Sequence, residues 1–189
     1  ADREGFKVKS GVRLYGGFAG TETSIDERET LDFPYRLKYR SILSGDIAKN
    51  DTLDAVNLIF PGNGTRDDNA THVLSIDMNP SSSSGNNTSY PTVVNGFTVT
   101  GGHAAAADGK GGGIYIYGDN SSGGIFRIEQ CFIASNYAAQ GGAIYVAEEV
   151  GNVNNNTSLI SQCVAYNNAA GERSTEENEG GGFYIAGEA

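Results

Sequence analysis

The sequence predicts an all-β fold, a parallel β-solenoid in which successive coils of the chain stack on one another. Two interleaved motifs, each repeated three times at intervals of 30 to 39 residues, indicate this fold. Glycine supplies 27 of the 189 residues, about twice its usual share, as expected for a chain with many tight corners. A chain of this length, with 38% hydrophobic residues and a formal charge of −10, has the size and core content of one domain.

The first motif is a glycine pair followed by an alternating apolar strand. Its copies span Gly111–Ile116, Gly141–Val146 and Gly180–Ile185. The alternation has the two-residue period that is typical of a strand and not the 3.6-residue period of a helix. The residue at the centre of each strand alternates to the outer face, so we expect an outward aromatic ladder. The ladder residues are Tyr115, Tyr145 and Tyr184.

The second motif is another short strand, found at Val94–Val99, Ile128–Ile133 and Ile160–Ala165. In a parallel solenoid each coil pairs with the coils above and below it at about 4.8 Å, so equivalent positions become continuous columns. We expect three apolar columns that point into a shared interior. They are Val94, Ile128 and Ile160; Phe97, Cys131 and Cys163; and Val99, Ile133 and Ala165.

A small or amide residue follows each copy of the second motif at the same offset: Gly102, Asn136 and Asn168. Corners between coil faces need left-handed dihedral angles, which Gly adopts freely and Asn tolerates. We therefore expect these residues to share one stacked corner, where the Asn amides can bond along the axis. For Cys131 and Cys163, a buried thiol stack is favoured over a disulfide, because inward parallel side chains rarely reach the required torsion angle.

Further segments extend the pattern: Ala1–Ser24, Ile42–Ile47, Asn69–Leu74 and Asn95–Gly102. Together with the two motifs, they make the chain resemble, nearly from end to end, right-handed parallel β-helix proteins of the pectate-lyase-like and polymorphic-outer-membrane-protein type. The resemblance implies a right-handed parallel β-helix (β-solenoid) with long polar insert loops, in which residues 1–189 form a single domain, a fragment of a longer rod or a fibril subunit. It also implies an extracellular or cell-surface protein with an adhesive or structural role, and it specifies no activity.

Three polar loops are longer than the tight turns usual in that group: Asn79–Tyr90, Glu148–Thr157 and Gly171–Glu179. The chain carries eight Asn-X-Ser/Thr sequons, whereas its composition gives roughly 2.5 by chance. Glycans at these sites would project into water, although loops rich in Asn and Ser also raise the count. The predicted acceptors are Asn50, Asn63, Asn69, Asn86, Asn87, Asn120, Asn155 and Asn156.

Catalytic side chains do not form a recognisable set. A pectate-lyase-type mechanism needs acidic calcium ligands beside an Arg or Lys base, but the position equivalent to Arg127 on the next coil is Leu159. His72 and His103 have no Ser or Cys partner at a recognisable spacing. The sequence therefore predicts no catalytic residue and a protein that is not an enzyme. The alternative is a carbohydrate-binding or polysaccharide-degrading β-helix, in which the tyrosine ladder would form a sugar-stacking surface.

The candidate metal ligands are Asp46, Asp51 and Asp54, whose carboxylates are the hard oxygen donors that calcium prefers. A solvated acidic turn explains the same residues without a metal, and no other cofactor is predicted. With 13 Lys and Arg against 23 Asp and Glu, the chain lacks the basic surface of a nucleic-acid-binding protein. It also lacks the run of about 20 apolar residues that a membrane-spanning helix needs, so no membrane insertion is expected in this segment.

The ends of a solenoid expose unpaired strand edges and an apolar cross-section unless something covers them. No amphipathic capping helix is evident, and the one helix-like segment is Ser24–Leu31, with Ser24 as its N-cap. The expected partners are further coils, either more of the same chain or copies stacked head to tail, together with N-linked glycans and, in the alternative, polysaccharide. The sequence thus predicts a non-enzymatic, extracellular, glycosylated structural or adhesive solenoid that assembles end to end into a rod or fibril.

Overall fold

The computed structural model describes residues 3–31, 36–51, 64–79, 90–106, 109–118, 124–147, 150, 157–171 and 181–186. This part of the chain is nearly all β. Its helical segments are two 3-10 turns, η1 (Ile25–Glu27) and η2 (Gly64–Arg66), and it contains no helix that is long and apolar enough to cross a membrane. The helix-like segment expected at Ser24–Leu31 is thus reduced to η1, and Ser24 makes no side-chain capping bond there.

In the described residues the strands form four parallel sheets and one antiparallel pair. In spatial order, the first sheet consists of β1 (Glu4–Lys9), β6 (His72–Asp77), β10 (Ile114–Tyr117), β14 (Ile144–Val146) and β18 (Phe183–Ile185). The second sheet consists of β15 (Leu159–Ser161), β11 (Phe126–Glu129), β7 (Thr92–Asn95) and β2 (Arg13–Tyr15). The third sheet consists of β16 (Val164–Tyr166), β12 (Phe132–Ala134), β8 (Phe97–Thr100) and β5 (Ser41–Ser44). The fourth consists of β17 (Ala169–Ala170), β13 (Tyr137–Ala138) and β9 (His103–Ala104), and the antiparallel pair is β3 (Thr30–Leu31) with β4 (Arg36–Leu37).

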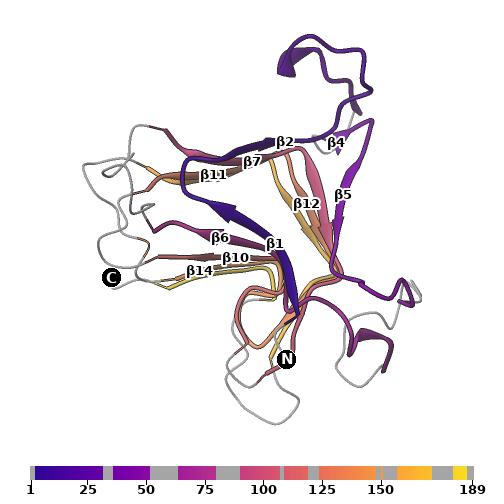
Figure 1. The fold of residues 1–189 in the computed structure, drawn as a ribbon, viewed down its shortest axis with the longest axis vertical. Coiled ribbons are helices and arrows are strands. Elements are labelled where there is room, and N and C mark those ends of the chain that lie inside the picture. Colours follow the sequence, from indigo (N-terminus) through magenta and orange to yellow (C-terminus); the bar gives the residue numbers. More distant parts are fainter. Residues whose placement is uncertain are drawn as a thin grey trace.

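The chain visits the sheets in turn, and we call one such passage a coil. In the middle coil, β10 pairs with β6 and β14, β11 pairs with β7 and β15, and β12 pairs with β8 and β16, all in parallel. Figure 1 looks along the stack and shows the first three sheets as the sides of a triangle around a common interior. The stacked parallel sheets are compatible with the predicted β-helix.

Two of the predicted apolar columns are confirmed by the strand register. Ile128 pairs with Val94 on one side and with Ile160 on the other. Ile133 pairs in the same way with Val99 on one side and with Ala165 on the other. Ile128 and Ile133 are both fully buried, and Cys131 between them is buried as well. Positions about 34 residues apart in the sequence are therefore neighbours in one interior.

The predicted corner exists, but its left-handed residue comes one position earlier than expected. Ser135 and Asn167 have φ angles of 57° and 52°, and each precedes an asparagine of the predicted corner. Asn136 Nδ2 donates hydrogen bonds to the carbonyl oxygen of Val99 at 3.1 Å and to Asn168 Oδ1 at 2.9 Å. Asn168 Oδ1 also accepts a bond from the backbone N–H of Asn136 at 3.1 Å. The left-handed residue makes the bend, and the next residue is then free to bond along the axis, as predicted for the Asn amides.

Truncation of the central core residue should show that the columns stabilise the fold. We expect Ile128→Ala to lower the free energy of unfolding by roughly 2–5 kcal/mol, because it leaves a cavity in a fully packed interior. Ile160→Ala should cost less, since Ile160 lies in the last described coil and is only half-buried. Urea titrations of the two variants and the wild type would measure the difference.

Arg127→Ala is the matched control, because Arg127 lies on the same strand with an exposed, outward side chain. It should change stability by no more than about 0.5 kcal/mol. Equal effects of Ile128→Ala and Arg127→Ala would contradict the assignment of the interior.

Candidate functional site

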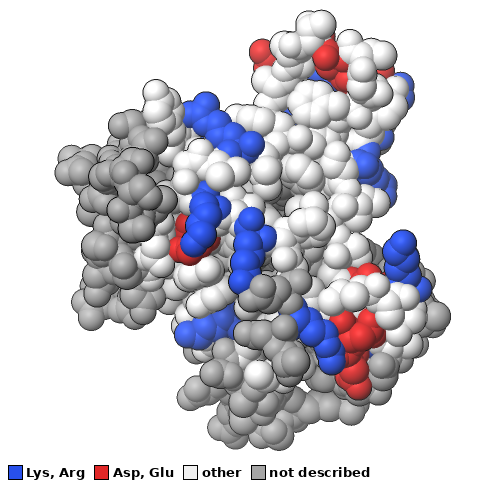
Figure 2. All heavy atoms as spheres, in the orientation of Figure 1, with Lys and Arg blue, Asp and Glu red and all other residues white. Residues whose placement is uncertain are grey.

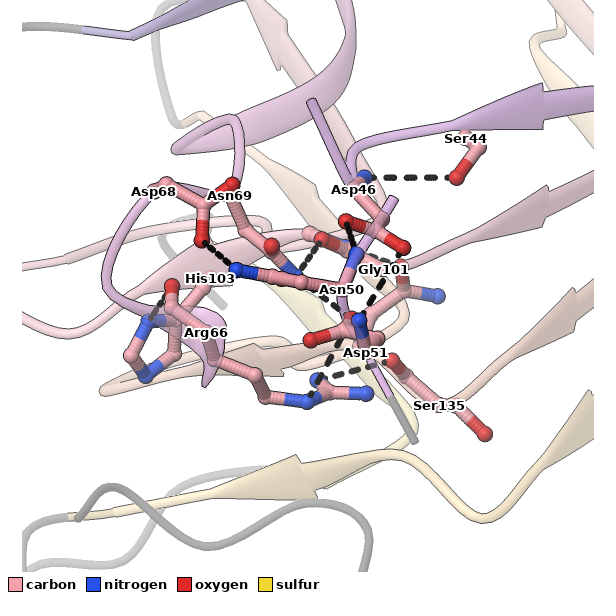
Figure 3. Close-up of polar contacts among 12 residues, drawn as sticks. Ser44, Asp46, Asn50, Asp51, Arg66, Asp68, Asn69, Gly101, His103 and Ser135 are labelled. Atoms are coloured by element: carbon pink, nitrogen blue, oxygen red, sulfur yellow. Dashed lines mark hydrogen bonds and ion pairs between the residues drawn. The ribbon is translucent and has the colours of Figure 1, made fainter. Parts of the chain in front are cut away.

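The residues that follow β5 form a polar turn on the side of the coil stack (Figure 3). The carboxylate of Asp46 accepts hydrogen bonds from the backbone N–H groups of Asn50 at 3.1 Å and Asp51 at 3.3 Å. Asp68 accepts bonds from the backbone N–H of Ala48 at 2.9 Å and from Asn50 Nδ2 at 3.2 Å. These carboxylates therefore act as backbone-capping groups, a common role for Asp in turns.

Asp51 continues this network into the protein, where it meets a buried arginine (Figure 3). Asn69 Nδ2 donates to Asp51 Oδ2 and to the carbonyl oxygen of Gly101, both at 2.8 Å. Arg66 Nε lies 3.9 Å from the same Asp51 oxygen, and Arg66 Nη1 donates to the carbonyl oxygen of Ser135 at 3.1 Å. Burial lowers the pKa of the Arg66 guanidinium, and the nearby Asp51 carboxylate opposes that shift. The cluster ties η2 to the stacked corner.

Two of the three calcium ligands considered from the sequence, Asp46 and Asp51, lie in this turn. The carboxylate of Asp46 accepts two backbone N–H bonds, Asp51 Oδ2 accepts a bond from Asn69 Nδ2, and Arg66 places a positive charge beside Asp51, where it would repel a metal ion. Within the described ranges, no group of three or more His, Cys, Asp or Glu side chains could hold a metal ion. Asp54 lies outside the described residues.

Two of the eight sequon asparagines lie in the described part of the chain. Asn50 is exposed, so its side chain is accessible for a glycan. Asn69 is only 2% exposed, and its Nδ2, the atom that a glycan would occupy, donates two hydrogen bonds inside the cluster. Burial thus removes Asn69 from the acceptors available on the folded surface. The other six, Asn63, Asn86, Asn87, Asn120, Asn155 and Asn156, lie outside the described residues.

The tyrosine ladder forms on the outer face of the first sheet. Tyr145 pairs in register with Tyr115 and Tyr184, and its ring centroid lies 5.8 Å and 5.1 Å from theirs. His72 stacks on Tyr115 at 4.8 Å and extends the ladder by one coil. Tyr145, however, is only 4% exposed, and Lys110 Nζ lies 5.1 Å from its ring centroid. The ladder is therefore not a continuous surface on which sugar rings could stack.

The two histidines and Arg127 have structural contacts. His72 Nδ1 lies 2.9 Å from the carbonyl oxygen of Gly111, and His103 Nδ1 lies 2.9 Å from that of Arg66. Arg127 is the register partner of Leu159, as expected. Both histidines thus have a backbone partner, and Arg127 Nη1 lies 3.9 Å from Glu129 Oε1.

Cys131 and Cys163 are free thiols at equivalent positions of adjacent coils. Cys131 Sγ lies 3.3 Å from the carbonyl oxygen of Glu129, and Cys163 Sγ lies 3.2 Å from that of Ser161. A hydrogen bond with Cys163, and then burial, hold the pKa of the Cys131 thiol well above its usual value. Cys131 is thus an unreactive core residue, in line with the predicted thiol stack.

A groove that the sequence analysis did not single out lies between the second and third sheets and the segment that contains η1. Its volume is about 560 Å³. Its polar lining includes Asp26, Arg28, Asn95, Glu129, Gln130 and Gln162. The sequence does contain a signal for this groove, because a glutamine precedes each of the stacked cysteines. From the sequence alone, however, only the core-facing cysteine of each pair could be assigned a position.

Core-facing residues are exposed at both ends of the coil stack. At one end Phe6 pairs with the buried Leu74 but is itself 50% exposed. At the other end Phe183 and Ile185 pair with buried residues of β14 and are 42% and 68% exposed. In the described part of the chain, no strand pairs with the outer edges of β1, β2 and β5, or with those of β15, β16, β17 and β18.

Comparisons with protein-family models, with curated proteins and with solved structures find no match for this chain. The resemblance to pectate-lyase-like and polymorphic-outer-membrane-type proteins is thus supported at the level of stacked parallel β-sheets and not at the level of a family.

The buried cluster should make stability depend on pH through His103. Burial lowers the pKa of His103, and its Nε2 is buried without a hydrogen-bond partner. Below the unfolded-state pKa of about 6.5 the unfolded chain binds a proton that the folded chain does not, so stability falls as the pH drops. His103→Gln keeps a hydrogen-bond donor for the carbonyl oxygen of Arg66. We expect this variant to reduce the loss of stability at low pH by up to about 1.4 kcal/mol per pH unit.

Urea titrations between about pH 5.5 and 7.5, a window set around the free histidine pKa, would compare His103→Gln with the wild type. Identical pH dependence in the two proteins would show that His103 titrates normally in the folded chain.

Proposed function

We propose that this chain is a right-handed parallel β-helix with a non-enzymatic structural or adhesive role outside the cell, and that it assembles end to end into a rod or fibril. The observation that carries the proposal is the state of the two ends. Both ends present unpaired strand edges in the described residues, together with core-facing side chains that water reaches. Such surfaces are normally covered, because exposed edges and apolar cross-sections promote association.

The two ends match each other in geometry. The first sheet ends in β1 on one side and β18 on the other, the second in β2 and β15, and the third in β5 and β16. All of these pairings are parallel, so a second copy placed against β15, β16 and β18 would meet them with β1, β2 and β5 in the same direction. Phe6 of one copy would then extend the interior below Phe183 and Ile185 of the other. This contact is heterologous and leaves both outer ends open, so it generates a rod.

Charge is distributed unevenly along the chain. Nine of the 13 Lys and Arg lie in residues 1–49, together with eight Asp and Glu. Residues 50–189 hold the other four against 15 Asp and Glu. Figure 2 shows the end with β1, β2 and β5, where several Lys and Arg side chains gather around these strands. The Lys and Arg residues are thus concentrated in the first coil, whereas most of the negative charge of the chain lies after it.

An extracellular location is supported by the sequons. Eight acceptor motifs in 189 residues exceed the number expected from composition, and Asn50 carries one of them on an exposed turn.

Carbohydrate binding on the tyrosine ladder is the second candidate. Stacked aromatic rings on an outer sheet face favour it. The burial of Tyr145 weighs against it, because the central ring offers no free face. We therefore rank the ladder as a stabilising element of the first sheet.

Assembly can be tested by placing charge on the end formed by β18. The wild-type chain should form species whose mass grows with concentration in sedimentation experiments, and electron micrographs should show rods. The double variant Phe183→Lys and Ile185→Lys should stay monomeric, because two desolvated ammonium groups at the contact are costly.

Tyr117→Lys is the matched control. Tyr117 lies on β10, whose two edges are already paired with β6 and β14, so this variant should assemble like the wild type. A wild-type chain that remains a monomer with finished ends would rule out contact between copies.

Glycosylation can be tested site by site in protein secreted from a eukaryotic host. Folded material should carry a glycan on Asn50 and none on Asn69, since Asn69 Nδ2 is buried and bonded. Glycopeptide mass spectrometry would read the occupancy of both positions in the same sample. An occupied Asn69 in folded protein, or an empty Asn50, would contradict the assignment.

A further inference from the structure

The outer face of the first sheet carries a hollow beside the tyrosine ladder. It lies over β1, β6 and β10, and its volume is about 150 Å³. Among the described residues, two cationic side chains, two aliphatic hydroxyls and three aromatic rings line it, and no Asp or Glu does. The whole chain has a formal charge of −10, so a positively charged hollow is a local exception.

The strand register opens the hollow above Ser75. Ser75 pairs with Lys7 of β1 on one side and with Tyr115 of β10 on the other, and all three line the hollow. The side chain of Ser75 is much shorter than those of its two neighbours. Because adjacent strands lie about 4.8 Å apart, the backbones of Lys7 and Tyr115 are separated by roughly 10 Å, which leaves room for a small ligand above the serine.

Both cations of the hollow, Arg3 and Lys7, come from the segment that contains β1. Gly5 lies between them, and a Cβ at this position would lie 2.2 Å from the carbonyl oxygen of His72 and 2.4 Å from that of Val73. Glycine is therefore required for β1 to lie this close to the start of β6. The close approach holds the segment with both cations against the strand that carries Ser75.

Several donors of the hollow are not used by the protein. In the part of the chain that the structure describes, the Arg3 guanidinium and the hydroxyls of Thr71 and Ser75 have no hydrogen-bond or ion-pair partner. The backbone N–H of Thr71 donates to the carbonyl oxygen of Arg3 at 2.9 Å, so these two residues are neighbours. Arg3 and Lys7 are exposed and Thr71 is half-buried. A ligand that accepts hydrogen bonds can therefore reach them.

Two carboxylates near the hollow are engaged elsewhere. Asp77, the register partner of Tyr117, is ion-paired with Lys9. Asp68, which interacts electrostatically with Arg3, accepts two hydrogen bonds from the polar turn after β5. Neither carboxylate lines the hollow. An anion there would meet the charges of Arg3 and Lys7 without a carboxylate between them.

The side of the hollow opposite Lys7 is a wall of stacked rings. Tyr115 stacks on His72 at 4.8 Å and on Tyr117 at 5.1 Å between ring centroids. His72 is held in place through its Nδ1, which lies 2.9 Å from the carbonyl oxygen of Gly111. Tyr115 and Tyr117 are half-buried, so part of each side chain is open to a ligand. Such a wall suits the organic part of an ester whose charged group lies beside Lys7.

The donors reach the hollow from several sides: Lys7 from β1, Ser75 from below, and Arg3 and Thr71 from the starts of the two strands. Phosphate and sulfate present oxygens in several directions, whereas the two oxygens of a carboxylate lie in one plane. Arg and Lys side chains are the usual partners of phosphate groups in proteins. The arrangement of donors therefore favours a tetrahedral oxyanion over a carboxylate.

From these observations we infer that the hollow binds a tetrahedral oxyanion, phosphate or sulfate, either as the free ion or as the charged group of a small ester. This site goes beyond the structural role proposed above. It does not depend on contact between copies, because that contact uses the outer edge of β1, whereas the hollow lies on the face of the sheet.

The test is calorimetric titration of the whole chain with sodium phosphate, sodium sulfate, phenyl phosphate and phenyl sulfate. Benzoate and trigalacturonate serve as the carboxylate comparison. At least one tetrahedral oxyanion should bind saturably and more tightly than both carboxylates. Tighter binding of a phenyl ester than of its inorganic ion would identify an ester as the ligand, and similar affinities would identify the free ion.

Two variants locate the binding. Lys7→Met keeps the apolar stem and removes the charge, so it should raise the Kd roughly tenfold, as expected for the loss of one charge-assisted contact. Ser75→Ala removes the hydroxyl below the ligand and should raise the Kd roughly threefold. Lys38→Met is the matched control, because Lys38 is an exposed lysine that pairs with Glu29 outside the hollow. It should bind like the wild type.

Thermal unfolding followed by circular dichroism would show that each variant is folded. The inference is overturned if no tetrahedral oxyanion binds, if a carboxylate binds as tightly, if Lys7→Met and Ser75→Ala both bind like the wild type, or if Lys38→Met loses as much affinity as Lys7→Met. Sedimentation of the same samples reports assembly separately, so failure of the oxyanion site and failure of the rod are distinguishable.

Discussion

Lateral pairing between coils is the constraint on which the rest of the structure depends. Each strand of the three main sheets is three to six residues long, too short to be stable in isolation, and its hydrogen bonds go to the coils above and below. That pairing fixes which residues become neighbours, so the interior consists of columns of equivalent residues from successive coils. Ile128 and Ile133 are buried because the chain returns to the same place after each coil.

Polar side chains stabilise the corners between sheets, where strand pairing does not satisfy every backbone group. Asn136 bonds to carbonyl oxygens that the bend would leave unsatisfied inside the corner, and burying such groups without partners is costly. Arg66 and Arg28 act similarly from outside, since the Arg66 guanidinium reaches the backbone of a distant coil at Ser135 and the Arg28 guanidinium reaches the side chain of Gln130 on another. Charged residues on excursions from the stack thus anchor those excursions to its corners.

The repeat in the sequence accounts for the parts of the fold that recur. Strands at 94–99, 128–133 and 160–165 could be aligned because stacking demands similar residues at equivalent positions. The position of the left-handed residue could not be predicted in this way, because nothing in the sequence distinguishes Ser135 and Asn167 from other polar residues. Contacts that occur once, such as Arg28 with Gln130 or Asn69 with Asp51, leave no periodic trace. For that reason the groove and the burial of Asn69 emerged only from the three-dimensional arrangement.

Gly96 gives the η1 segment a defined place on the stack. A Cβ at Gly96 would lie 2.6 Å both from Arg28 Nη1 and from the carbonyl oxygen of Gly16, so glycine leaves room for the guanidinium there. In a filament of identical copies, the η1 segment would recur once per copy, at an axial period of roughly 24 Å for five strands at the usual spacing. If successive copies add without rotation, all the η1 segments would lie along one flank of the filament.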